Sequence, residues 1–261
     1  MARILFLVIL ILFLLSSLGA DKLSVAQFEQ RILELTNAER ARFGLKPLVY
    51  ESGLAALAKH HSNNMAKYGF FDHTDQEKLD VSRRREKYYP ELLASSIGEN
   101  LAYNEIPSRK FSPADIVTGW MNSPGHRENI LTPEYTHLGV GVVLKGSKLY
   151  STQNFGTAIV KLKSALPKTL KRNKRYVLEF EYLSPQARQG FKASLKLPDP
   201  TKIVNITERT YVRGYVPLES GWKSATEFSV TVDLTHGKGE YVLNFGWDGL
   251  FFERCFVFKV K

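Results

Sequence analysis

Apolar residues recur at helical spacing in three segments of the first half of the chain. Ser24 and Gln27 have the spacing of a capping box, so a helix is predicted to begin after Ser24 and to end at Gly44. A second apolar stripe predicts a helix from Ser52 to Gly69. A third helix is predicted from Ser112, which precedes a proline, to a break at residues 123–125.

The apolar period changes from helical spacing to two after these segments. Apolar and polar residues alternate over 138–144 and again over 149–155, with the turn sequence Lys-Gly-Ser-Lys between them. Helices followed by a hairpin predict an α+β layered fold for the first domain.

Every candidate element in the last third of the chain has the alternation of a strand. The predicted strands are 176–183, 191–197, 202–206, 210–216, 228–234, 241–247 and 252–260. About seven strands in about 90 residues predict a second, all-β domain that is an immunoglobulin-like sandwich.

Residues 1–20 have the order of a secretory signal peptide. Arg3 is followed by an unbroken apolar run over 4–15 and then by small residues. The run of about a dozen residues is short for a bilayer core of about 30 Å. We therefore expect cleavage near Ala20 and a secreted or cell-envelope protein, with an uncleaved N-terminal anchor as the alternative.

The remaining chain is expected to form two domains, 21–166 and 176–261. Between them, residues 167–175 are basic and have no apolar period, so they are predicted to be a linker. The single cysteine, Cys255, lies in an alternating segment and is expected to be a buried small hydrophobic residue.

The chain has 36 Lys and Arg against 26 Asp and Glu, a formal net charge of +10. An exported basic protein suits anionic envelope polymers, whereas nucleic acid is not an expected partner outside the cell. A lysine-rich soluble surface with no such partner would give the same charge.

Three residues after turns or glycines, His73, Glu99 and His126, are the candidates for chemistry. Two imidazoles and a carboxylate form a ligand set that suits zinc with an open coordination position. Spacing alone does not distinguish such a site from three unrelated polar residues.

Several motifs occur in order along residues 28–160. They are Leu-Thr-Asn-Ala-Glu-Arg at 35–40, Phe-Asp-His at 71–73, Gly-Glu-Asn at 98–100, Ser-Pro-Gly-His-Arg at 123–127, Leu-Gly-Val-Gly at 138–141 and Gln-Asn-Phe-Gly at 153–156. Together with Trp120 they resemble the bacterial branch of the CAP superfamily, the SCP-like extracellular domain. The resemblance implies an α-β-α sandwich with a surface cleft.

In many members of that superfamily the cleft holds two histidines and two acidic residues, sometimes with zinc. His73, Glu99 and His126 match three of these positions, and Ser123 stands at the fourth. A serine there has no carboxylate, so one ligand or base is missing. Asn100, Ser123, His137 and Gln153 are candidates for the rim of this cleft, and Glu99 is the candidate for a base.

The remaining polar residues are expected to be structural or solvated. His61 lies on the apolar stripe of the second helix and is expected to be a hydrogen-bonded core histidine, and Trp120 is expected in the core. His137 is expected at the surface. The run Arg83–Arg85 is expected to be a solvated face.

Three functions remain open from the sequence. The first is a non-enzymatic binding module whose cleft holds a lipid, glycan or peptide. The second is a metal-assisted hydrolase in which a metal on the two histidines activates water and Glu99 accepts its proton. The third is a structural or adhesive envelope protein. The hydrolase lacks a clear nucleophile, and a metal bound by all three residues would leave no separate base.

Overall fold

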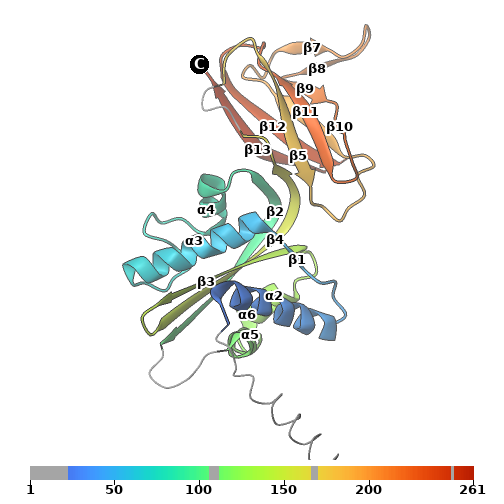
Figure 1. Cartoon of the computed structure of the whole chain (residues 1–261). Helices are drawn as coiled ribbons and strands as arrows, with labels where there is room; N and C mark the ends of the chain where they lie inside the picture. The colour runs from blue at the N-terminus through green and yellow to red at the C-terminus, as the bar shows by residue number, and fades with distance from the viewer. Residues whose placement is uncertain (1–22, 106–111, 166–169, 248–249) are drawn as a thin grey trace, which may run out of the picture.

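The computed structural model describes residues 23–105, 112–165, 170–247 and 250–261 (Figure 1). The expected signal peptide, 1–20, lies outside the described residues. Within the described ranges, no helix is both long enough and apolar enough to cross a lipid bilayer.

The three predicted helices are confirmed as α2 (Val25–Arg42), α3 (Ser52–Tyr68) and α5 (Pro113–Met121). Ser24 and Gln27 form the expected capping box at the start of α2. Two further helices, α4 (Val81–Tyr88) and α6 (Pro124–Leu131), were not predicted. The break expected at 123–125 is instead the start of α6, because Pro124 occupies the first helical position.

The first domain is built on a sheet of four strands: β1 (Val49–Tyr50), β2 (Leu92–Glu105), β3 (His137–Lys145) and β4 (Lys148–Leu162). β4 lies between β2 and β3 and is antiparallel to both, so the predicted hairpin is confirmed. Figure 1 shows α3 on one face of this sheet and α2, α5 and α6 on the other. The α+β class is therefore confirmed.

Two glycines allow α3 to lie directly on β3. A Cβ atom on Gly139 would be 2.0 Å from the Ala55 nitrogen, and one on Gly141 would be 2.2 Å from the Lys59 nitrogen. Only glycine lets the helix and the strand approach this closely.

The second domain is all-β in its described residues, as predicted. Its strands are β5 (Arg175–Tyr182), β6 (Lys192–Lys196), β7 (Ile203–Asn205), β8 (Tyr211–Arg213), β9 (Tyr215–Leu218), β10 (Gly221–Trp222), β11 (Glu227–Asp233), β12 (Gly239–Trp247) and β13 (Leu250–Val260). One layer is β5-β11-β10, the other is β13-β12-β6-β9, and β7 and β8 form a separate pair. The immunoglobulin-like arrangement stays a prediction.

An aromatic core joins the two layers of this domain. Phe180 on β5 contacts Phe228 on β11 with ring centroids 5.4 Å apart, and Phe245 on β12 at 5.0 Å. Cys255 is 8% exposed, which confirms it as a buried residue. Burial raises the pKa of its thiol to about 11, so the thiol stays protonated and unreactive at neutral pH.

The sheet of the first domain continues into the second. Val160, Lys161 and Leu162 at the end of β4 pair with Tyr182, Glu181 and Phe180 of β5. The predicted linker is wrong in its described part, because Leu170 forms a bridge with Val260 and the Asn173 N–H donates to the Leu234 carbonyl. Residues 170–175 therefore belong to the β domain, and residues 166–169 lie outside the described chain.

Candidate functional site

The candidate site lies along β2, which pairs only with β4 among the described strands and so forms an edge of the first-domain sheet. Glu99 projects from β2, and His73 lies in the segment between α3 and α4. His73 Nδ1 and Glu99 Oε1 are 3.0 Å apart. The His73 side chain is 58% exposed, whereas the Glu99 side chain is 3% exposed. The structure thus joins two of the three predicted residues.

A third member of the site, Arg84, was not predicted. Its NH2 donates to Glu99 Oε2 at 2.5 Å, and its NH1 donates to the carbonyl oxygens of His73 at 2.7 Å and Leu79 at 2.8 Å. The Arg84 side chain is 0% exposed. Such a paired, hydrogen-bonded arginine holds the carboxylate and the histidine loop in one geometry.

The expectation of a solvated arginine run is therefore wrong for Arg84. Residues 81–88 form helix α4, and Asp80 caps its first turn by accepting from the Arg83 N–H. Arg83 is exposed, while the next position turns toward the core. No apolar period indicates this helix in the sequence, because its inward-facing residue is an arginine and not an apolar residue.

His61 is buried next to Glu99 and to the segment that carries His73. Its Nε2 is 2.9 Å from the Asp72 carbonyl oxygen and 4.0 Å from Glu99 Oε1, and the side chain is 0% exposed. Burial lowers the pKa of His61, so the ring stays neutral near pH 7. The prediction of a hydrogen-bonded core histidine is confirmed, and the residue also faces the carboxylate.

His126 approaches the site from α6, on the other side of the β2 edge. The Asn100 Nδ2 donates to its carbonyl oxygen at 3.0 Å, which fixes the helix beside β2. Burial lowers the pKa of His126, and the positive charge of His73 lowers it further. In contrast, the hydrogen bond to Glu99 raises the pKa of His73. The two histidines are thus arranged so that His73 carries a proton more readily than His126.

Asn100 and Gln153, two of the four rim candidates, are buried. Both side chains are 0% exposed, and the Asn100 Nδ2 donates to Gln153 Oε1 at 3.2 Å. Gln153 Nε2 donates to the Thr36 hydroxyl on α2 at 2.7 Å. The Asn129 amide on α6 donates to Asn100 Oδ1 at 2.9 Å. This network ties the strands to the helices and satisfies buried polar groups.

The other two rim candidates have different positions. Ser123 is the partly exposed residue that precedes α6, next to the turn that carries His126. His137 is 5% exposed, so the expectation of a surface residue is wrong. β1 pairs with β3 at His137, and β4 separates this residue from β2. Trp120 is in the core as predicted, 2% exposed, and its Nε1 donates to the Leu101 carbonyl at 2.8 Å.

The arrangement does not fit a metal ion as it stands. Across the described ranges, no three His, Cys, Asp or Glu side chains are placed to hold one. The physical obstacle is Arg84, since its guanidinium occupies Glu99 Oε2 and would repel a divalent cation at that carboxylate. The expected zinc site would require Glu99 to leave both Arg84 and His73.

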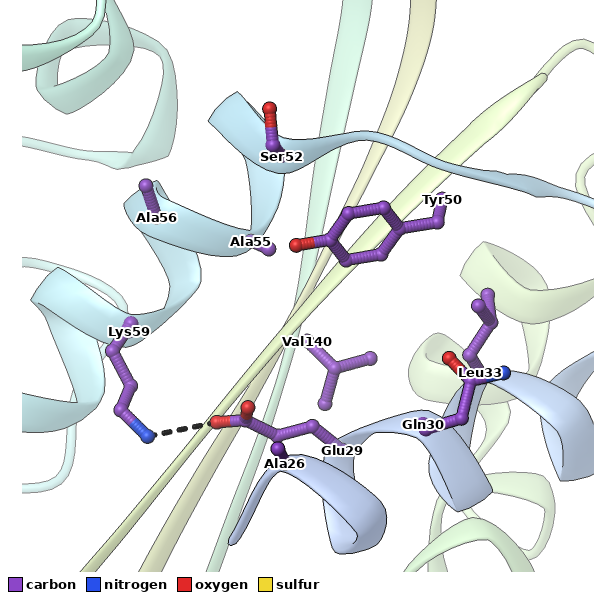
Figure 2. A pocket seen from close by; sticks show the side chains of 10 residues that line it. All are labelled: Ala26, Glu29, Gln30, Leu33, Tyr50, Ser52, Ala55, Ala56, Lys59 and Val140. Atoms are coloured by element: carbon purple, nitrogen blue, oxygen red, sulfur yellow. Dashed lines mark hydrogen bonds and ion pairs between the residues drawn. The ribbon is translucent and has the colours of Figure 1, made fainter.

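A hollow of about 430 Å³ lies away from these residues, between α2 and α3 (Figure 2). Figure 2 shows the Tyr50 ring at one side and the Glu29–Lys59 ion pair at the other. Glu29 Oε1 accepts from the Val142 N–H at 2.7 Å, and Lys59 Nζ donates to the Val142 carbonyl at 2.5 Å. The ion pair thus satisfies the backbone N–H and carbonyl of Val142, on the part of β3 that does not pair with β1. Charged side chains commonly protect an exposed strand edge in this way.

A wider groove of about 980 Å³ lies where α4 and β2 meet β13 of the second domain. Arg85, Phe251 and Val257 are among the residues that line it, and the cleft histidines are not. Sequence reasoning could not find this groove, because its walls come from segments more than a hundred residues apart.

Comparison with known proteins assigns the first domain. Residues 33–155 match the model of the CAP, cysteine-rich secretory protein family. Over 127 residues the chain is 39% identical to uncharacterized protein YkwD of Bacillus subtilis (strain 168), covering 48% of this chain and 46% of that protein. It is also 39% identical over 127 residues to uncharacterized membrane protein YlbC of the same strain, covering 49% of this chain and 34% of that one.

Among solved structures, the chain is similar to an extracellular protein containing a SCP domain from Bacillus anthracis str. Ames. The identity is 30% and the TM-score 0.43, over 52% of this chain and 45% of that chain. The chain spans less than half the length of the two Bacillus subtilis relatives. Residues 33–155 match the CAP, cysteine-rich secretory protein family, so the first domain of the chain is a CAP domain.

Proposed function

We propose that the protein is an exported binding module that acts without catalysis and holds its ligand in the cleft around His73. The observation that carries this proposal is the buried contact between Arg84 and Glu99. It makes the carboxylate a fixed structural partner of the histidine loop. The ligand then meets the exposed face of His73 and not a reactive group.

The geometry favours binding over hydrolysis because neither Glu99 oxygen is free. Oε1 faces His73 Nδ1 and Oε2 accepts from Arg84, and the side chain is 3% exposed. A general base must lie within hydrogen-bond reach of the proton that it removes from water or substrate. Glu99 lies beneath His73 and cannot reach a ligand in the cleft without breaking both contacts.

The exposed imidazole supports a polar ligand. The hydrogen bond to Glu99 raises the pKa of His73, so its free Nε2 is a hydrogen-bond donor over a wider pH range than in a free histidine. His126 stands opposite on α6 with a lowered pKa and offers a neutral ring. One donor and one neutral imidazole suit an oxygen-rich ligand such as a glycan or a peptide better than a hydrocarbon chain.

Location outside the cytoplasm is part of the proposal. It is supported by the signal-like order of residues 1–20 and by the similarity to an extracellular protein. The net charge of +10 suits anionic envelope polymers as a surrounding matrix. Mass spectrometry of the protein recovered from the culture medium or envelope should find an N-terminus near Ala20.

The binding proposal is tested by sedimentation with purified Bacillus subtilis cell walls. We expect residues 21–261 to sediment with the walls and His73→Ala to lose most of this binding. His236→Ala removes a histidine from the second domain and should bind as the wild type does. No sedimentation of the wild type, or equal sedimentation of His73→Ala, would contradict the proposal.

A further inference from the structure

We propose that the ligand of the cleft is a glycan, and that its sugar rings stack on an aromatic platform formed by Phe71 and Tyr103 beside His73. This inference rests on the proposed binding function and assigns the chemical class of the ligand. The platform is defined here as these two rings together with the buried Tyr150 ring that supports them.

Phe71 is an aromatic residue that the core does not use. Its side chain is 50% exposed, and it is separated from His73 by one residue. The backbone around it is nevertheless fixed, because His61 bonds to the Asp72 carbonyl and Arg84 to the His73 carbonyl. Two fully buried side chains therefore fix the backbone directly after this exposed phenyl ring.

Tyr103 continues the platform along β2. It follows Glu99 by four residues on the same strand, so both side chains point to the same face, roughly 13 Å apart. Its ring centroid is 5.9 Å from that of Phe71 and 5.0 Å from that of Tyr150, which is 3% exposed. The platform and His73 together extend far enough to contact more than one sugar residue.

The Tyr103 ring is held in place before any ligand arrives. Its hydroxyl donates to Glu105 Oε2 at 3.0 Å, and Lys148 lies 3.7 Å from the other Glu105 oxygen. A ring that contacts Tyr150 and has its hydroxyl bonded loses little conformational freedom on binding. Such rigid aromatic side chains are effective contact surfaces at low entropic cost.

This combination of groups matches sugars better than lipids or peptides. A pyranose ring presents C–H groups on its faces, which are attracted to the negative face of an aromatic ring, and hydroxyl groups on its edges. Polar groups that can meet hydroxyls are close along the chain or in contact: Asp72 and His73 follow Phe71, and Tyr103 donates to Glu105, which pairs with Lys148. A hydrocarbon chain would need an enclosed apolar pocket, whereas the Phe71 ring is 50% exposed and the Tyr103 ring is partly exposed.

The test uses wall glycan and wall peptide as separate probes. Glycan strands freed of stem peptides by an amidase, and the released stem peptides, are titrated into residues 21–261 by calorimetry. We expect the strands to bind and the stem peptides not to bind. Phe71→Ala and Tyr103→Ala should each weaken strand binding by about tenfold, while Tyr103→Phe, which keeps the ring, should bind within about twofold of the wild type.

Two control variants remove exposed aromatic rings from the second domain. Phe251 is 41% exposed and Tyr211 is 60% exposed. Phe251→Ala and Tyr211→Ala should leave strand binding unchanged. Equal losses in the control and platform variants would mean that the effect is not specific to the platform, and would overturn the proposal.

Failure of the glycan assignment is distinguishable from failure of the binding function. Wild-type protein that binds whole walls through His73 but binds only stem peptides would overturn the glycan ligand and leave the binding module intact. Strand binding that survives Phe71→Ala and Tyr103→Ala would overturn the platform. Absence of any wall binding would contradict both proposals together.

Discussion

The Arg84 guanidinium and the Glu99 carboxylate are 2.5 Å apart, with side chains 0% and 3% exposed. This contact connects α4 to β2 and, through the His73 carbonyl, to the loop that carries the exposed imidazole. One buried ion pair thus links the stability of the first domain to the geometry of its cleft.

Removing the arginine should therefore be costly. We expect Arg84→Met to lower the free energy of unfolding by about 3–5 kcal/mol, because it leaves a buried carboxylate without its charged partner. Arg83→Met, one position along α4 and exposed, should change it by no more than about 0.5 kcal/mol. Urea denaturation followed by circular dichroism compares the two, and similar values would show that the pair is not a structural contact.

The pH dependence of the cleft should reveal the His73–Glu99 bond. That bond raises the folded-state pKa of His73 above the unfolded value of about 6.5. The stabilisation is therefore fully present below about pH 6.5 and is lost as the pH rises through the folded pKa. Since the ring is 58% exposed, we expect a small effect on stability.

Nuclear magnetic resonance titration of the histidine rings checks this directly. The His73 ring should titrate above the range of a free histidine, and the His61 and His126 rings below it. Glu99→Gln removes the negative charge and should move the His73 titration downward. An unchanged His73 titration in that variant would contradict the assigned bond.

Zinc should bind weakly or not at all to the wild-type cleft. The Arg84 guanidinium occupies one oxygen of the only carboxylate that is joined to His73 in the described residues. We expect calorimetric titration with zinc to give the same negligible heat for the wild type and for His126→Ala. Tight binding by the wild type that disappears in His126→Ala would show that the cleft rearranges to release Glu99.

A glycine at the close contact between α3 and β3 and a glycine with open space around it give a matched pair of variants. Gly139→Ala would place a Cβ 2.0 Å from backbone of α3, and overpacking of this kind costs about 1–3 kcal/mol or more. Gly119 lies in α5 with no atom within 4 Å of an added Cβ. Gly119→Ala should therefore stabilise the protein by about 0.5–1 kcal/mol. Thermal unfolding of both variants is the measurement.

The helices that the sequence predicts are those with local signals. α2 and α5 have capping boxes, and α3 has an apolar stripe that ends in a left-handed glycine, Gly69. α4 has no such stripe, because its buried position is Arg84 and its partner Glu99 is distant in sequence. Only the tertiary fold shows that this charge is paired and buried.

The candidate site was predictable in part for the same reason. His73 and Glu99 could be chosen by their motifs, and the structure brings them together. Asn100 and Gln153 belong to the same motifs, but their burial depends on Thr36 and Asn129, which lie on separate helices. His137 pairs with a two-residue strand, β1, that has too little sequence to show a period.

The pairing of β4 with β5 has a mechanical consequence. A force that pulls on the second domain while the cleft is anchored would act on continuous backbone, from Lys148 through Leu162, and on the hydrogen bonds of Val160 to Tyr182. The sheet is continuous across the two domains, so tension passes through these backbone hydrogen bonds. The second domain therefore resists being pulled away from the first until these hydrogen bonds break.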